Sequence, residues 1–420
     1  MNFFARKNDF VLFFRKILNT NLDAGVYSLV FFIATIVGAR YLSLAEFGLY
    51  SILFSVYLLL QGIYYGAIGE LILSAGRWED NVPEYLKGYA LFLMAIAISF
   101  FSLLAIPFLI TLDLTAFEII LYLLSSVSLI FLNNARYCFH ADDLHFYASI
   151  VSIAFFIGTI TSIFFLESIV DFMFFKDVSG AIKIFVAFGL SSLVVNLFAY
   201  SNLHINMQAK NLKKQWELYG QFTNKSVLLS IVFWIAGNLH WVILGAFYSP
   251  IFLGIMRGCL AIINPLQVID RALTVSLLSA KRKNGEIKVI LKRHLYIAWF
   301  IYFFIIGMWF AYSDLIILVT IGEKFIEYKN TISVLIFIPV FQVCFSLCSA
   351  TLKSLKIFMP QIFIQVFVPI VILIFIIFAK DGEKAILLAA GILGVNIFTS
   401  ISLLLYMKKS KNISQRLDYD

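Results

Sequence analysis

Long apolar runs separated by short polar connectors extend along almost the whole chain. A helix needs about 20 apolar residues to cross a hydrocarbon core of about 30 Å, and it satisfies its own backbone hydrogen bonds there. The predicted spans are residues 22–38, 45–69, 88–110, 117–132, 146–166, 181–200, 226–247, 251–280, 295–318, 332–352, 361–379 and 385–407. This pattern predicts an all-α integral membrane protein, with about twelve transmembrane helices in two six-helix bundles around a central cavity.

The composition excludes a water-soluble fold. Of the 420 residues, 62% are hydrophobic and only 13% are charged, and the mean hydropathy is +0.94. An ordinary soluble domain contains about 25% charged residues. No polar segment is long enough to form a soluble domain, so we expect lipid to cover the apolar surface.

Basic residues are concentrated in every second connector. Roughly 23 lie in the N-terminal segment, in alternate connectors and in the C-terminal tail, against about 7 in the intervening connectors. The first group includes Lys87 and Arg136, which we interpret as connector residues. The distribution follows the positive-inside rule and predicts that both termini are cytoplasmic. The net charge of +8 therefore reflects membrane topology, and we expect no nucleic-acid partner.

One long polar connector divides the predicted spans into two sets. We predict a cytoplasmic interfacial segment (residues 1–21), an N-terminal six-helix bundle (22–200), a cytoplasmic linker (201–225), a C-terminal six-helix bundle (226–407) and a cytoplasmic tail (408–420). A disordered basic segment is the alternative for residues 1–21. Both bundles begin on the same side of the membrane, so a duplication would be parallel, although the internal sequence match is weak.

The eighth span carries polar residues at helical spacing. Arg257, Asn264 and Arg271 are seven residues apart, and Gln267 joins the same face of a regular helix. Placing a polar group in the hydrocarbon core costs free energy, so polar residues retained in a span usually face a cavity or another helix instead of lipid. These residues are therefore candidates for a cavity wall. Arginines near the ends of a span can instead extend to the headgroups.

The second and seventh spans carry similar stripes. Glu46, Tyr57 and Gln61 follow one another on the second span, and Asn238 shares a face of the seventh with Trp241. Hydrogen bonds between helices are the alternative interpretation. The candidate substrate-binding residues are Arg257, Arg271, Asn264, Gln267, Asn238, Trp241, Glu46, Tyr57 and Gln61.

Four titratable residues are candidates for ion coupling. His240 carries an imidazole, which titrates near neutral pH, and Asp270 lies next to Arg271. Asp23 and Glu70 lie at predicted cytoplasmic span ends, where solvated carboxylates are common. The sequence contains no GxxxxGK[ST] phosphate loop, no HExxH and no GxGxxG between a strand and a helix. We expect a non-enzyme without a cofactor or a catalytic metal.

Two segments resemble a known family. Residues Ala39 to Tyr50 read ARYLSLAEFGLY, which resembles the A-R-x-L-G-x-x-x-F-G-x-Y pattern of the O-antigen flippases. These form the Wzx group of the multidrug/oligosaccharidyl-lipid/polysaccharide exporter superfamily. Gly254 to Arg257 resembles the family's G-x-Y-R at the start of the eighth span, and chain length and span number extend the resemblance over most of the chain. Two positions depart from the family pattern: Ser43 replaces the usual Gly, and Met256 replaces the usual Tyr. The second departure puts in doubt any role that the family's Tyr would imply for position 256.

The resemblance implies translocation of an undecaprenyl-diphosphate-linked oligosaccharide, such as an O-antigen repeat, across a bacterial inner membrane by alternating access. A diphosphate carrying several sugars cannot cross a bilayer unaided at a useful rate. We expect Arg257 and Arg271 to attract the diphosphate or acidic sugars, and the amide and aromatic side chains to contact sugar hydroxyls. Membrane lipid, a polysaccharide polymerase and a chain-length regulator are the further partners implied.

Two alternatives remain open. A membrane-embedded polysaccharide polymerase has comparable length, but such proteins usually carry a large periplasmic loop, and the longest outward connector here is the short segment from Glu167 to Gly180. A related drug or cation antiporter would need acidic residues deep in its helices, whereas this chain places its acids near span ends.

Overall fold

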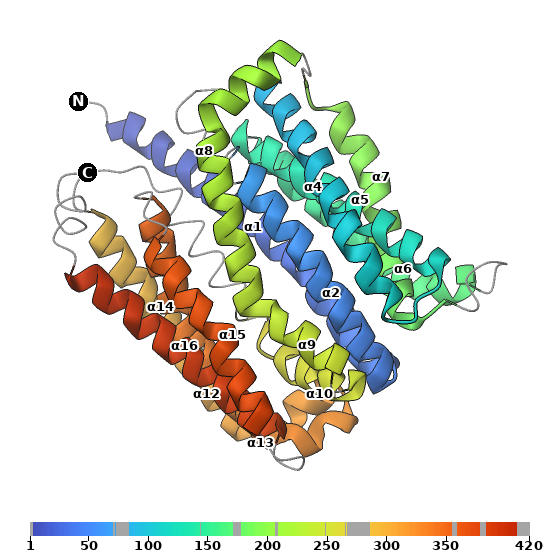
Figure 1. The fold of residues 1–420 in the computed structure, drawn as a ribbon. Helices are drawn as coiled ribbons and strands as arrows, with labels where there is room; N and C mark the ends of the chain where they lie inside the picture. The colour runs from blue at the N-terminus through green and yellow to red at the C-terminus, as the bar shows by residue number, and fades with distance from the viewer. Residues whose placement is uncertain are drawn as a thin grey trace. The chain divides into compact units, whose positions relative to one another are not determined.

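The structure is a computed structural model. It describes residues 3–69, 72, 84–142, 144–170, 178–205, 209–247, 249–264, 266, 286–354, 359–378 and 384–409. Within these ranges every regular element is helical (Figure 1). The prediction of an all-α, multi-pass membrane protein is confirmed. Eight of the described helices are long and apolar enough to cross a membrane, or up to nine if Glu323–Leu335 and Ile338–Ser349, bent by 44°, form one span.

The chain divides into two compact units, Met1–Ala34 with Leu53–Ile231 and Thr35–Ile52 with Val232–Asp420. The first contains most of α1 (Phe3–Tyr41) and of α2 (Leu44–Tyr64), followed by η1 (Tyr65–Gly69), α4 (Glu84–Ile110), α5 (Ala116–Ala141), α6 (His145–Val170), α7 (Gly180–Ser201) and most of α8 (Ala209–Trp234). The second contains η2 (Ile235–Leu239), α9 (His240–Phe247), α10 (Pro250–Ala261), α12 (Glu286–Thr320), η3 (Glu323–Tyr328), α13 (Lys329–Leu335), α14 (Ile338–Ser354), α15 (Met359–Phe378) and α16 (Lys384–Lys409). The end of α1 and the beginning of α2 belong to the second unit.

Two segments outside the predicted spans are helical. The predicted linker at residues 201–225 is helical from Ala209 onwards, because the segment is amphipathic. Lys213, Lys214 and Glu217 are exposed on α8, whereas Gly220 and Thr223 are buried. The predicted interfacial segment is also helical from Phe3 and continues without interruption into the first span as α1.

Small residues allow the helices of the first unit to pack closely. A Cβ at Gly189 of α7 would collide with Ser125 of α5, so glycine is required for this approach. Ser192 donates to Ser128 at 2.8 Å, and the Asn196 amide donates to the Ser128 carbonyl oxygen at 2.8 Å. The opposite side of α7 exposes Leu193, Val194, Leu197 and Phe198. Helix α7 therefore packs its polar face against α5 and presents its apolar face to lipid.

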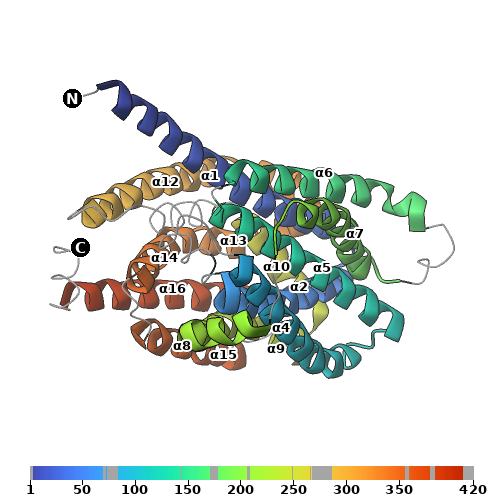
Figure 2. The same cartoon turned by 90° about the horizontal axis from the view of Figure 1, so that it is seen from above.

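The second unit is organised around α14, α15 and α16, which pack side by side in both ribbon views (Figures 1 and 2). The Ser400 hydroxyl of α16 donates to the Phe341 carbonyl oxygen of α14 at 2.6 Å. The Ser349 hydroxyl of α14 donates to Gln361 of α15 at 2.8 Å. These buried bonds satisfy polar groups where no water is available. Helix α12 exposes four phenylalanines, at positions 300, 303, 304 and 310.

Three predicted spans differ from the observed helices. The fourth was predicted to end at residue 132, but α5 continues to Ala141 and includes Arg136. The seventh is interrupted by the π-helical segment η2. The eighth was predicted as one helix over 251–280, but α10 ends at Ala261, and Ile262 and Ile263 form a turn. Pro265 follows within four residues, and proline cannot donate a helical hydrogen bond.

Candidate functional site

A buried ion pair joins α1 and α5 in the first unit. Asp23 of α1 is 2% exposed and Arg136 of α5 is 5% exposed. The Arg136 guanidinium donates from Nε to Oδ1 at 2.9 Å and from Nη2 to Oδ2 at 2.7 Å. Such bidentate pairing is the strongest geometry for an arginine and a carboxylate. The sequence predicted Asp23 as a solvated carboxylate or an ion-coupling group, and the structure buries it against an arginine.

Two further donors complete the surroundings of Asp23. The His140 Nε2 of α5 lies 2.7 Å from Oδ2, and the Ser152 hydroxyl of α6 donates to Oδ1. Every one of these groups is a donor, which matches an ionised carboxylate. The charge of Asp23 is therefore balanced by Arg136 and fully hydrogen-bonded, as burial of a charge requires.

A hydrogen-bonded network continues from Arg136 toward α2. Arg136 Nη1 donates to Asn133 Oδ1 at 3.1 Å, and Asn133 Nδ2 donates to the Tyr27 hydroxyl at 2.9 Å and to the Tyr57 hydroxyl at 3.4 Å. The two tyrosine hydroxyls are 3.4 Å apart. The Arg136 guanidinium also lies 3.8 Å from the centre of the Tyr27 ring, within the range of a cation–π interaction. Tyr57, a predicted substrate-binding residue, is therefore fully buried within this network.

The other end of the network is a pair of histidines. The Nδ1 atoms of His140, near the end of α5, and His145, at the start of α6, lie 2.8 Å apart. Their side chains are largely buried. The network thus connects α1, α2, α5 and α6.

Helical spacing explains why these residues meet, and it was a signal available in the sequence. Asn133, Arg136 and His140 follow one another at steps of three and four, which places them on one face of α5. The same rule that identified the stripes on other spans applies here. The predicted fourth span ends at residue 132 and leaves Arg136 in a connector, so the prediction does not include this face. Lys87, assigned likewise, is in the first turn of α4 and donates to Asp142 at 2.6 Å.

A second cluster lies in the second unit. The Arg257 guanidinium of α10 is 5.2 Å from the centre of the Trp241 ring, which is buried on α9. Tyr50 of α2 is close enough to interact electrostatically with Arg257. Close helix approach places these groups together: a Cβ at Gly254 would collide with the Leu44 carbonyl oxygen, and one at Gly48 with that of Pro250. Two predicted residues, Arg257 and Trp241, are thus brought together.

The remaining predicted residues do not form one described site. Asn238 in η2, Asn264 after α10 and Gln61 in α2 are each half-buried. The stripe predicted on the eighth span requires a regular helix, and that regularity ends at Ala261. Five predicted positions lie outside the described residues, in whole or for their side chains: Arg271, Gln267, Asp270, Glu70 and His240.

Glu46 has a local structural role. Its carboxylate accepts from the Ser43 backbone N–H at 3.3 Å, and the Ser43 hydroxyl accepts from the Glu46 backbone N–H at 3.2 Å. This reciprocal pair is a capping box at the start of α2. The S-x-x-E spacing that signals it is present in the sequence and explains Glu46 without a ligand.

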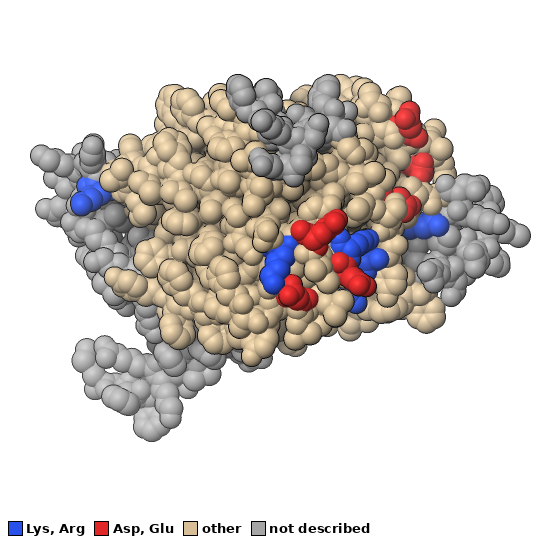
Figure 3. Space-filling model, turned by 90° about the horizontal axis from the view of Figure 1, so that it is seen from below, with Lys and Arg blue, Asp and Glu red and all other residues tan. Residues whose placement is uncertain are grey.

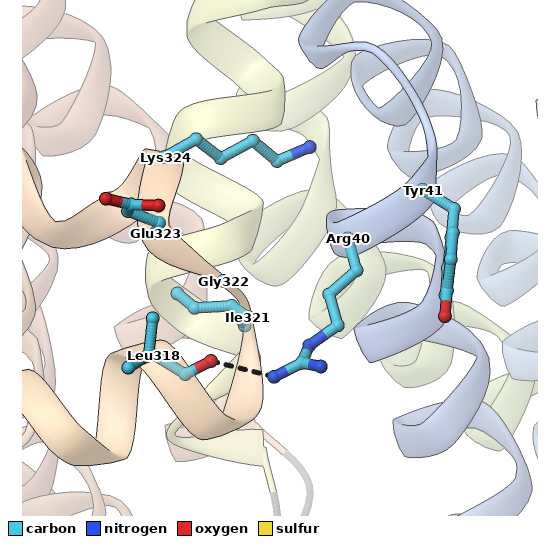
Figure 4. Close-up of a pocket in the computed structure, with 7 residues that line it drawn as sticks. All are labelled: Arg40, Tyr41, Leu318, Ile321, Gly322, Glu323 and Lys324. Atoms are coloured by element: carbon cyan, nitrogen blue, oxygen red, sulfur yellow. Dashed lines mark hydrogen bonds between the residues drawn. The ribbon is translucent and has the colours of Figure 1, made fainter.

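Arg40 and Lys324, both in the second unit, each donate hydrogen bonds to carbonyl oxygens at the end of a helix. Arg40 Nε donates to the Thr320 carbonyl oxygen at 2.8 Å and Nη2 to that of Leu318 at 2.7 Å, at the end of α12 (Figure 4). Lys324 Nζ donates to the Leu42 carbonyl oxygen, just after α1, at 2.9 Å. These cations satisfy carbonyl groups that a helix end leaves without partners. They also line an open cavity of about 390 Å³. In Figure 3, basic and acidic side chains gather in the lower middle of the face, and further charged side chains lie toward its two sides.

Solved transporter structures share the fold of nearly the whole chain. A multidrug resistance MATE family transporter of the MOP superfamily, in an outward-facing conformation, matches with a TM-score of 0.70 and 14% identity over 95% of this chain and 96% of that one. A MATE in complex with MaL6 matches with a TM-score of 0.68 and 15% identity over 95% and 96%. A MOP superfamily transporter from Pyrococcus furiosus, reported to have a binding pocket of reverse polarity, matches with a TM-score of 0.66 and 14% identity over 95% of each chain. No family model and no curated relative matches the sequence.

The chain therefore has the fold of MOP superfamily transporters, with their twelve-span type of architecture. This is the superfamily that the segment from Ala39 to Tyr50 resembles. At 14–15% identity the likeness establishes the fold alone, so the substrate has to be argued from the side chains.

Proposed function

We propose that this protein moves an undecaprenyl-diphosphate-linked oligosaccharide from the cytoplasmic to the periplasmic leaflet of a bacterial inner membrane by alternating access. The fold supports a transporter, since a MATE family transporter with this fold is known in both inward-facing and outward-facing conformations. The flippase-like motif at Ala39–Tyr50 supports the glycolipid substrate. Both termini are cytoplasmic in this proposal.

The observation that carries the substrate class is the Arg257–Trp241 pair. A guanidinium among apolar helices is costly to retain, and it pairs readily with phosphate oxygens. An indole face suits the apolar face of a sugar ring and supports the cation beside it. An arginine beside an aromatic ring therefore fits a ligand that carries both diphosphate and sugars.

A cationic drug is the competing substrate, which the MATE fold alone would favour. Such a cargo needs an acidic group whose charge is available. Asp23 is bound by Arg136, and the buried Glu118 accepts from the backbone of Ser179 at 2.9 Å and of Thr115 at 3.0 Å. Among the described residues these buried carboxylates are already engaged, and a reversed pocket polarity has been reported for another transporter of this fold. The side chains therefore favour an anionic cargo.

The proposal is tested in the native host by deleting the gene and restoring it with variants. We expect deletion to trap lipid-linked repeats on the inner leaflet, Arg257→Ala to fail to restore surface polysaccharide, and Arg257→Lys to restore part of it, because lysine keeps the charge without the planar fork. Lys213→Ala, at an exposed position on α8, is the control and should restore it fully. Full restoration by Arg257→Ala at normal protein levels would remove Arg257 from the site. Repeats found outside but unpolymerised would indicate a polymerase instead.

A further inference from the structure

The contact between His140 and His145 restricts how many protons the two rings can hold. Their Nδ1 atoms are 2.8 Å apart, a distance at which one nitrogen must donate and the other accept. Two N–H groups cannot face one another here, so a single proton lies between the rings. His140 Nε2 faces the Asp23 carboxylate at 2.7 Å and therefore carries a proton as well.

These constraints define two protonation states of the pair. With both rings neutral, His140 holds its proton on Nε2, and the shared proton is bonded to His145 Nδ1. When a proton adds to His145 Nε2, a new N–H bond forms there, and the shared proton can move from His145 Nδ1 to His140 Nδ1. The positive charge then resides on His140, next to Asp23. A second positive charge is excluded, because it would require two protons between the Nδ1 atoms.

We propose that His140 and His145 form a relay that takes up one proton per cycle and couples transport to proton movement, with Asp23 held permanently ionised by Arg136 as its counter-charge. The coupling rests on the proposed transport function, whereas the one-proton relay does not. In this arrangement the exchangeable proton belongs to the imidazoles, and the carboxylate stays charged throughout. The net charge of Asp23, Arg136 and the two rings alternates between zero and plus one.

The groups around the relay support this assignment. Asp23 faces His140 from α1, Arg136 lies one turn earlier on α5, and His145 approaches from α6. Lys87 of α4 is held by Asp142, which leaves that pair neutral. Among the described residues, no group of three or more His, Cys, Asp or Glu side chains is arranged to hold a metal ion.

The relay has consequences beyond the two rings. A charge on His140 gives Asp23 a second cation and weakens the hold of Arg136 on that carboxylate. Arg136 connects through Asn133 to Tyr27 and Tyr57, so the change reaches α1 and α2 by hydrogen bonds. Proton binding can in this way alter the packing of α1 and α2 against α5.

The relay itself is tested by nitrogen NMR of the full-length protein labelled with ¹⁵N-histidine in nanodiscs. The chain has five histidines, and His204 is an exposed reference. We expect a scalar coupling across the N–H···N bond between two Nδ1 atoms, and joint uptake of one proton by that pair as the pH is lowered. Two independent titrations without that coupling would overturn the relay. The wild-type spectrum decides this, so no variant has to fold.

The coupling is tested in proteoliposomes loaded with lipid-linked oligosaccharide, by comparing transport rates over a series of pH values. We expect His145→Gln to fold, as judged by size-exclusion chromatography, and to lose the pH dependence, while His204→Gln keeps it. Wild-type movement whose pH dependence is unchanged in His145→Gln would overturn the coupling. If the wild type moves no oligosaccharide, the proposed function fails, and the NMR titration still decides whether the relay exists.

Discussion

Replacing Asp23 by asparagine removes one charge from the buried Asp23–Arg136 pair and hardly changes the shape of the side chain. Arg136, 5% exposed, then keeps a positive charge without its bidentate partner. Breaking a buried pair from one side costs about 3–5 kcal/mol, because an uncompensated charge stays in the interior. For a chain of 420 residues this corresponds to a melting temperature lower by roughly 3–6 °C.

Thermal unfolding of the detergent-solubilised protein, followed by fluorescence-detected size exclusion, measures the loss. The matched control is Asp314→Asn, which breaks the ion pair with Lys329 in the second unit, whose side chains are 64% and 41% exposed. Solvent screens this pair, so its loss should cost about 0–1 kcal/mol.

The double variant Asp23→Asn with Arg136→Gln is the sharper comparison. Removing both charges eliminates the uncompensated cation, so we expect the double variant to be more stable than Asp23→Asn alone. Two results would contradict a buried, mutually dependent pair. One is that Asp23→Asn has the same melting temperature as Asp314→Asn. The other is that the stability lost in the double variant equals the sum of the losses at Asp23 and at Arg136.

Three further changes test packing and capping. Gly48→Ala should destabilise the protein by about 1–3 kcal/mol, because a Cβ there collides with the backbone of Pro250, and a lower melting temperature would show it. Gly307→Ala, on α12 where a Cβ meets nothing within 4 Å, should instead raise stability by up to about 1 kcal/mol; equal effects at the two glycines would contradict the close approach at Gly48. Arg40→Ala should lower stability by about 1 kcal/mol, since the last carbonyl groups of α12 lose their donor, and Arg40→Lys should recover part of it; no loss in Arg40→Ala would show that the cap is unimportant.

Hydropathy was sufficient for the helical class and for most spans, because lipid burial imposes long apolar runs on any helix that crosses a membrane. It failed at span ends, where a charged residue is ambiguous. Arg136 was interpreted as a connector residue because its charge follows an apolar run closely. Its partner Asp23 is 113 residues away, and no local pattern records such a pairing.

Local signals were available for some of the differences. The Ser43-to-Glu46 spacing is a capping pattern and explains why Glu46 turns back on the helix start. Pro265 in the eighth span is a reason to expect an irregular helix there. The seven-residue spacing of Arg257 and Asn264 places them on one face only if the helix is regular, so it is weak evidence for a common face. The contact of Arg257 with Trp241 depends on close packing at Gly48 and Gly254, which only three-dimensional structure reveals.

The most direct test uses purified protein reconstituted with lipid-linked oligosaccharide isolated from the native host. Membrane-impermeant periodate oxidises only the sugars that face the outside of the liposome. With the wild-type protein, we expect sugars from the inner leaflet to become reactive over time, whereas Arg257→Ala behaves like protein-free liposomes. A wild-type protein that leaves the inner pool protected, while it moves a cationic dye across the same membrane, would contradict the account and favour a drug exporter.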